Sequence, residues 1–225
     1  MVRLVLFDID GTLIRTGGAG VQAFERTLAS VFNVQNGTAR VKFAGRVDPS
    51  IIRECFAHHQ IAATPENFRH FFACYVFWLD HLLHQFQGGP CAGVWRFIRG
   101  LQALPQPPVL GLLTGNIRLG AEIKLRHYGL WELFATGAFG DDHEHRRQLA
   151  VIARERGSRL LGRPLRGDEV LVVGDTPHDI DCARAIEAKT LAVATGGASL
   201  EDLKAHHPTW FAEEMTQVTA EEVCA

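Results

Sequence analysis

The sequence predicts an α/β fold in which a Rossmann-like parallel sheet is flanked by helices. Buried parallel strands are continuous apolar runs, and crossover helices separate them along the chain. Three such runs, residues 4–7, 109–113 and 170–173, are each followed directly by polar residues. Because ligands of open α/β sheets bind beyond the carboxyl ends of the strands, we expect these polar residues to line one crevice.

The first run ends in the motif Asp8-Ile9-Asp10-Gly11-Thr12. Asp8 and Asp10 are two residues apart, so their side chains point the same way while the chain is extended. Gly11 allows a sharp turn after them. Asp-Gly pairs also occur in ordinary turns. Four fixed residues at this spacing, however, should arise by chance only about 10⁻³ times in a chain of this length.

Residues 15–90 are predicted to form an all-helical insert between two glycine-bearing hinges. Pairs of an N-capping residue and a proline, Asp48-Pro49 and Thr64-Pro65, predict the starts of two of its helices. The parallel sheet is then built from residues 1–14 and 91–225. We call residues 15–90 the helical insert.

The remainder of the chain alternates between helical and strand patterns, which favours βαβ units. We expect helices over about 92–104, from 117, over 146–156 and through 183–186, strands over 109–113, 134–139, 170–173 and 190–194, and a short surface helix over 213–225.

The composition argues against nucleic acids and membranes as binding partners. The formal net charge is −2, so no basic field invites nucleic acid, and the apolar runs are too short for a membrane span. The five cysteines are scattered and odd in number, which is typical of reduced thiols. We therefore expect a cytoplasmic protein that binds neither nucleic acid nor membranes. We expect it to be a monomer or a homodimer.

The polar residues at the strand ends predict phosphate chemistry with a metal ion. Clustered carboxylates repel one another, and a hard cation with oxygen ligands, Mg²⁺, resolves this repulsion and usually shares its shell with a phosphate. One carboxylate can attack phosphorus while a second moves the proton. The residues concerned are Asp8, Asp10, Gly11, Thr114, Gly115, Asn116, Asp175 and Asp179.

The chain resembles the haloacid dehalogenase superfamily, close to its phosphoglycolate-phosphatase-like branch, over essentially its whole length. The resemblance rests on Asp8-Ile9-Asp10-Gly11-Thr12, Leu113-Thr114-Gly115-Asn116 and Gly174-Asp175-Thr176-Pro177-His178-Asp179. It implies a mobile helical cap at the place of the helical insert, and hydrolysis of a small phosphorylated metabolite.

The same resemblance implies a role for each matching residue. Asp8 would be the nucleophile and Asp10 the general acid and base. Mg²⁺ would be bound by Asp8, the backbone carbonyl of Asp10, and Asp175. The phosphate would be bound by Thr114 and Asn116. Asp179 would support the metal site or orient the cation.

The sequence departs from the family pattern in its third motif, where a lysine is usual. No lysine lies between Lys124 and Lys189. Arginine can replace it, because its guanidinium is a permanent cation that binds phosphate in a bidentate manner. We favour Arg146 over Arg147, and we expect Lys124 to lie too far along its helix to take part.

Substrate choice should come from the helical insert, where Arg46 is a candidate contact for the leaving group. A sugar-phosphate mutase would use the same acids. A catalytically idle binding or regulatory domain is the alternative from another class, since the third-motif lysine is missing.

Overall fold

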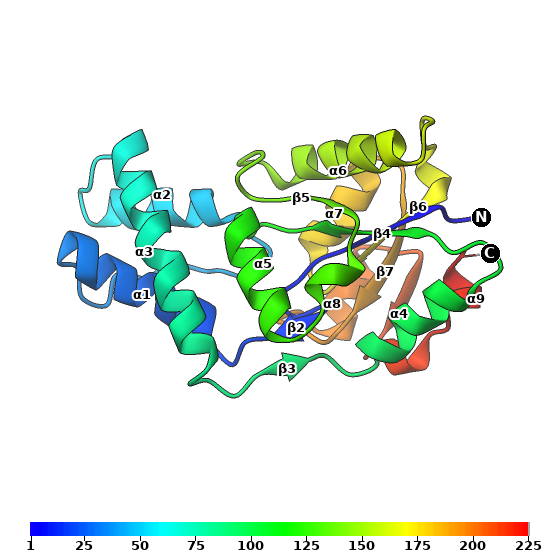
Figure 1. Cartoon of the computed structure of the whole chain (residues 1–225), viewed down its shortest axis with the longest axis horizontal. Coiled ribbons are helices and arrows are strands. Elements are labelled where there is room, and N and C mark those ends of the chain that lie inside the picture. Colours follow the sequence, from blue (N-terminus) through cyan, green and yellow to red (C-terminus); the bar gives the residue numbers. More distant parts are fainter. Residues whose placement is uncertain (225) are drawn as a thin grey trace.

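The computed structural model describes residues 1–224 and confirms the α/β architecture (Figure 1). Six strands form one sheet in the order β5-β4-β1-β6-β7-β8, and every neighbouring pair is parallel. The strands are β1 (Leu4–Phe7), β4 (Val109–Leu113), β5 (Thr136–Ala138), β6 (Val170–Gly174), β7 (Lys189–Val193) and β8 (Trp210–Ala212).

Helices cover both faces of this sheet. They are α4 (Val94–Ala103), α5 (Arg118–His127), α6 (Arg146–Leu160), α7 (Pro177–Ala185), α8 (Leu200–Ala205) and α9 (Ala220–Cys224). Short 3₁₀ turns occur at Trp131–Leu133, Gly167–Glu169 and Met215–Gln217.

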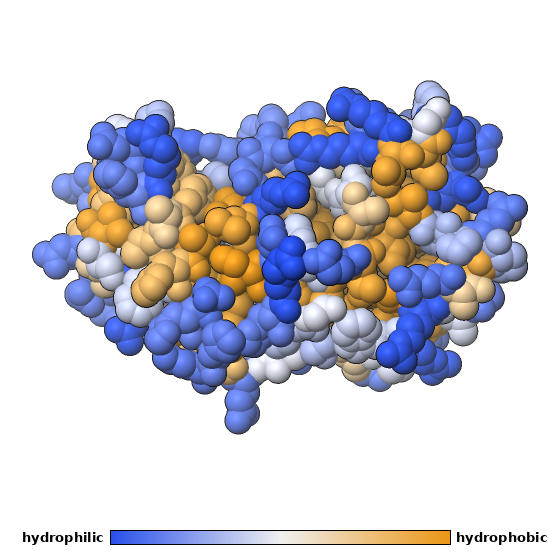
Figure 2. All heavy atoms as spheres, viewed as in Figure 1, coloured by the Kyte–Doolittle hydropathy of each residue, from blue (hydrophilic) through white to orange (hydrophobic). Residues whose placement is uncertain are grey.

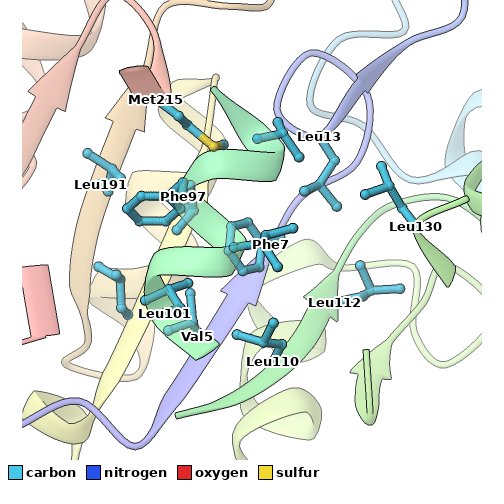
Figure 3. Close-up of a cluster of buried hydrophobic side chains, with 14 of the residues drawn as sticks. Val5, Phe7, Leu13, Phe97, Leu101, Leu110, Leu112, Leu130, Leu191 and Met215 are labelled. Carbon is cyan, nitrogen blue, oxygen red and sulfur yellow. The ribbon is translucent and has the colours of Figure 1, made fainter. Parts of the chain in front are cut away.

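The central strand β1 is buried on both sides, which explains its unbroken apolar sequence. Val5 and Phe7 pack in one hydrophobic cluster with Phe97 of α4 (Figure 3). Leu4 and Leu6 point to the opposite face and belong to a second cluster, with residues of α6 and α7. Strand β1 is therefore fixed from both faces, and the position of its carboxyl end is fixed with it.

The helical insert contains α1 (Ala19–Phe32), α2 (Asp48–His58) and α3 (Pro65–Leu83), which lie at one end of the molecule (Figure 1). These helices have a hydrophobic cluster of their own, rich in aromatic rings. Hydrophobic residues are visible on both the insert and the sheet side of one face, with a hydrophilic strip between them (Figure 2).

The chain enters and leaves the helical insert through a small ribbon. Strand β2 (Ile14–Arg15) pairs antiparallel with β3 (Gly89–Pro90), with Ile14 opposite Pro90. The two crossings between the insert and the rest of the chain are therefore adjacent.

Some local predictions were wrong. The N-cap of α2 is Val47, and Asp48 is the first helical residue. The helix expected over 213–225 is shorter than predicted, because the described part of this segment forms α9 only from Ala220 to Cys224, with Glu221 and Glu222 exposed; residue 225 lies outside the described residues. Helix α8 and strand β8 were missed.

The part of the chain that the structure describes contains no helix of the length and apolarity that a membrane span requires.

Candidate active site

The three strands that end in polar residues are neighbours in the sheet. Strand β1 lies between β4 and β6, with Phe7 opposite both Leu112 and Val173. In this register Asp8, Thr114 and Asp175 follow their strands at nearly the same level. The expectation that the polar clusters converge is therefore met by strand order and register together.

The turn after β1 brings the first motif against the last. Gly11 has φ +90°, and a Cβ there would overlap the Asp175 carboxylate. Only glycine combines that backbone conformation with so close an approach. The Thr12 hydroxyl then donates a hydrogen bond of 2.8 Å to Asp175 Oδ1. Glycine and threonine thus hold two strand ends together.

Three buried carboxylates, Asp8, Asp175 and Asp179, form what we call the acidic cluster; one oxygen of each lies within 4.8 Å of the others. Burial, partly offset by Arg146, raises the pKa of Asp8 to about 6. Burial and the charges of Asp8 and Asp179 raise that of Asp175 to about 8. Carboxylates that are costly to ionise without a counter-ion, with oxygen atoms this close, fit the donor set of a divalent hard cation.

Arg146 supplies a buried cation to the acidic cluster. It is the first residue of α6, and its Nη2 lies 3.0 Å from Asp8 Oδ1 and 2.6 Å from Asp179 Oδ1. These two carboxylates hold the pKa of Arg146 well above its usual range, despite the opposing effect of burial. Arg147, by contrast, has a 69% exposed side chain and lies 3.6 Å from Asp181. Of the two candidates, the structure places only Arg146 in the site.

Asp179 also caps the start of helix α7 (Pro177–Ala185). Its Oδ2 accepts hydrogen bonds from the Thr176 amide (3.0 Å) and hydroxyl (2.7 Å), and this capping box starts α7. Its Oδ1 remains for Arg146. Asp179 therefore orients Arg146, because the hydrogen bonds from Thr176 already fix the position of the Asp179 carboxylate.

Lys124 corrects one of our predictions. It lies within the site, because its Nζ is 2.7 Å from Asp10 Oδ2, 2.9 Å from Asp10 Oδ1 and 2.6 Å from Asn116 Oδ1. Its side chain is buried although it is charged. The expectation that Lys124 lies too far along α5 was wrong, since an extended lysine side chain tilts toward the N-terminus of its helix.

The second motif forms a compact hydrogen-bonded turn. Thr114 Oγ1 accepts from Asn116 Nδ2 at 2.8 Å, and the same amide group donates to Asp10 Oδ2 at 2.8 Å. The Thr114 hydroxyl hydrogen is free to be donated to a ligand. A Cβ at Gly115 would overlap the backbone carbonyl of Arg46, so glycine is required for contact with the helical insert.

Asp48 is a residue of the insert that sequence reasoning placed at a helix start rather than at the site. Its Oδ2 accepts a 2.9 Å hydrogen bond from the Ile117 amide, and its own amide donates to the Gly115 carbonyl at 2.8 Å. Burial raises the pKa of Asp48 to about 7, and the charge of Lys124 opposes that shift. Its position before a proline gave no signal beyond a helix start.

A cavity of about 630 Å³ opens between the helical insert and the strand ends. Asp8, Asp10 and Arg146 line it from the sheet. The insert contributes mainly apolar side chains, among them Val21, Phe24, Phe43, Ala44 and Ile51. Arg46 also lines the cavity, and its Nη1 is paired with Glu54 Oε2 at 2.5 Å.

Comparisons with known proteins agree with this geometry. Residues 5–193 match the family model described as haloacid dehalogenase-like hydrolase. The chain is 26% identical over 217 residues to the pyrophosphatase PpaX of Anoxybacillus flavithermus, covering 96% of this chain and 95% of that protein. It is also 26% identical over 226 residues to the protein of the same name in Bacillus cereus, covering 96% of this chain and 94% of that one.

Solved structures share the fold. CbbY from Rhodobacter sphaeroides, solved in complex with phosphate, superposes with a TM-score of 0.74 at 16% identity. A predicted phosphoglycolate phosphatase from Haemophilus somnus superposes with a TM-score of 0.73 at 18% identity. Each alignment covers 96% of both chains. At these identities the likeness shows the fold alone.

Proposed function

Because this chain belongs to the haloacid dehalogenase-like hydrolases, we propose that it is a Mg²⁺-dependent phosphatase. It hydrolyses a small-molecule phosphate monoester through an aspartyl-phosphate intermediate. The observation that carries this proposal is the placement of Asp8, within the acidic cluster, and Asp10 on one cavity. We further propose that the substrate is a small phosphorylated metabolite and that the protein acts in the cytoplasm as a monomer or homodimer.

The first half of the reaction forms the phosphoenzyme. A carboxylate oxygen of Asp8 forms a bond to phosphorus while the bond from phosphorus to the ester oxygen breaks. The departing oxygen takes a proton from the protonated Asp10 carboxyl group, and the alcohol leaves. Bound Mg²⁺, held by the carboxylates of Asp8 and Asp175 and the carbonyl of Asp10, would neutralise phosphoryl charge.

The second half regenerates the enzyme. Asp10, now a carboxylate, accepts a proton from a water molecule whose oxygen attacks the phosphorus of the aspartyl-phosphate. The bond between phosphorus and the Asp8 oxygen breaks, inorganic phosphate forms, and Asp8 returns as a carboxylate. The same residue thus serves as acid and then as base.

The remaining phosphoryl oxygens require fixed donors. The Thr114 hydroxyl and the Gly115 amide, which directly follow β4, are suited to this role. Arg146 contributes a fixed positive charge where negative charge grows in the transition state. Donors fixed by the fold need no rearrangement during the reaction.

Pyrophosphate is a second candidate substrate, because two similar proteins carry the name pyrophosphatase PpaX. The insert side of the cavity favours an organic leaving group instead. Its wall is largely apolar, and Arg46 is already paired with Glu54. The other cation that the insert places on this cavity, Arg15, donates to the Thr195 carbonyl, so an inorganic phosphate leaving group would meet mainly apolar side chains such as Val21 and Phe43.

The test is phosphate release from about one hundred phosphorylated metabolites and from pyrophosphate, with Mg²⁺ and with EDTA. We expect Mg²⁺-dependent turnover of organic monoesters above that of pyrophosphate. Turnover of pyrophosphate alone would support the second candidate. Interconversion of sugar-phosphate isomers without net phosphate release would indicate a mutase, and no turnover across the panel would support an idle binding or regulatory domain.

A further inference from the structure

We propose that Lys124 is a positioning residue for Asp10. Together with Asn116 it holds the Asp10 carboxylate in the orientation that activates water when the aspartyl-phosphate breaks down. This inference rests on the proposed function, and it assigns a task to a cation outside the three motifs that carry the family resemblance.

The hydrogen bonds to Asp10 come from two side chains that also contact each other. Lys124 Nζ contacts both carboxylate oxygens, at 2.9 and 2.7 Å, and Asn116 Nδ2 contacts Oδ2 at 2.8 Å. Among the described residues no other side chain donates to this carboxylate. A carboxylate offers about four acceptor positions, so roughly one remains for a water molecule or a substrate oxygen. The side chain is 43% exposed, which leaves it accessible from the cavity.

Lys124 is itself held in place. Asn116 Oδ1 accepts from Nζ at 2.6 Å while the amide group of the same side chain donates to Asp10. The three residues therefore form a closed ring of hydrogen bonds. The lysine stem is buried on the face of α5 that carries Gly120 and Ala121, which are also buried. Placing a lysine there costs desolvation energy that its charged partners must offset.

Arg146 and Lys124 contact different acids. Arg146 contacts Asp8 and Asp179, whereas Lys124 contacts Asp10. Arg146 is therefore placed to act in both halves of the reaction, because the phosphoryl group stays near Asp8 throughout. Lys124 affects the phosphoryl group only through Asp10, so its removal should affect the proton transfers by Asp10 rather than the binding of the phosphoryl group.

p-Nitrophenyl phosphate separates the two steps. Its leaving group departs readily without a proton, so formation of the phosphoenzyme does not need Asp10 as an acid. Breakdown of the phosphoenzyme still needs Asp10 as a base. A loss confined to breakdown appears as a rapid burst of about one nitrophenol per enzyme followed by slow turnover.

The experiment is rapid-quench and steady-state kinetics of Lys124→Met with this ester and saturating Mg²⁺. We expect kcat to fall about 10–100-fold, a part of the 10²–10⁴-fold attributed to acid–base catalysis. The burst rate should stay within about threefold of the wild type. KM should fall together with kcat, because kcat/KM depends only on the steps up to formation of the phosphoenzyme. Lys124→Arg, which retains the charge, should recover part of kcat. Arg126→Met, on the exposed side of the same helix, should change nothing.

Asn116→Ser provides a second variant that leaves the lysine in place, and it should show the same pattern with a smaller loss. If burst rate and kcat fall in proportion, or KM rises more than tenfold, then Lys124 binds phosphate or supports the fold, and the positioning role is overturned. A wild-type protein that, with Mg²⁺, releases phosphate neither from p-nitrophenyl phosphate nor from any metabolite of the panel overturns the proposed function itself. The two failures are therefore distinguishable.

Discussion

The acidic cluster and Asp10 differ in how much of their charge is withdrawn from water. The three residues of the cluster are buried, the side chains of Asp8 and Asp179 being 7% and 1% exposed, and Arg146 pairs with these two. Asp10 is 43% exposed at its side chain and has a cation of its own, Lys124. The buried acidic cluster suits a nucleophile and a bound metal ion, because both need a fixed position. The more exposed position of Asp10 suits a group that exchanges protons with the leaving group and with water.

The largest loss of activity should come from a substitution in the acidic cluster. Asp8→Asn removes the attacking oxygen, so kcat for any monoester should fall by at least about 10³-fold, as when other hydrolases lose their nucleophile. No nitrophenol burst should remain. The measurement is burst amplitude together with circular dichroism to confirm folding. Activity above about 1% of the wild type would contradict attack by Asp8.

The second effect tests which arginine belongs to the site. Arg146→Met should lower kcat about 10²–10³-fold, since fixed transition-state donors are worth that much. It also leaves two buried carboxylates without their cation, which should lower stability by about 3–5 kcal/mol in the absence of Mg²⁺. Arg147→Met is the matched control and should be neutral in both assays. A larger loss in Arg147→Met than in Arg146→Met would reverse the assignment.

A third measurement uses Asp48, the buried carboxylate of the insert. Burial raises its pKa from 3.8 to about 7, so between these values the folded protein binds more protons than the unfolded chain. Stability therefore falls as pH rises through this window. Asp48→Asn removes the effect and retains an oxygen that accepts from Ile117.

Denaturant unfolding of both proteins at about pH 5 and 8 measures that difference. The wild type should lose about 2 kcal/mol more than Asp48→Asn over this interval. Taking the difference cancels the titration of histidines common to both chains. Equal pH dependence of the two proteins would show that Asp48 is ionised throughout.

The smallest effect concerns Arg46. If it contacts the leaving group, Arg46→Ala should raise KM about threefold and leave kcat unchanged, since its partly exposed pair with Glu54 limits the gain. Glu54→Ala frees the guanidinium and should lower KM. An unchanged KM in both variants would assign the pair to the stability of the insert.

Sequence reasoning located the strand ends because two rules act together there. Apolar runs identify buried strands, and parallel strands place their carboxyl ends on one edge. Asp8, Thr114 and Asp175 followed from these rules without knowledge of any contact. Arg146 followed from its place at a helix start, although the spacing alone did not separate it from Arg147.

The contacts of Lys124 and Asp48 were not predictable in the same way. Lys124 lies on the apolar face of α5, seven residues after Ile117, and that placement was a usable signal. Its contact with Asp10 depends on how far a lysine reaches back along its helix. The contacts of Asp48 with Ile117 and Gly115 depend on how the helical insert packs against the strand ends, which the sequence does not indicate. Strand β8 has three residues and α8 has six, too few for a periodic pattern.

The β2–β3 ribbon has a consequence for how this architecture can vary. Since Arg15 lies opposite Gly89, the helical insert joins the rest of the chain at one point. An insert of another length or fold can replace this one at the ribbon without changing the strand order of the sheet or the register of β1. A protein with this plan can acquire a new substrate range by replacing one module while its reactive groups stay in place.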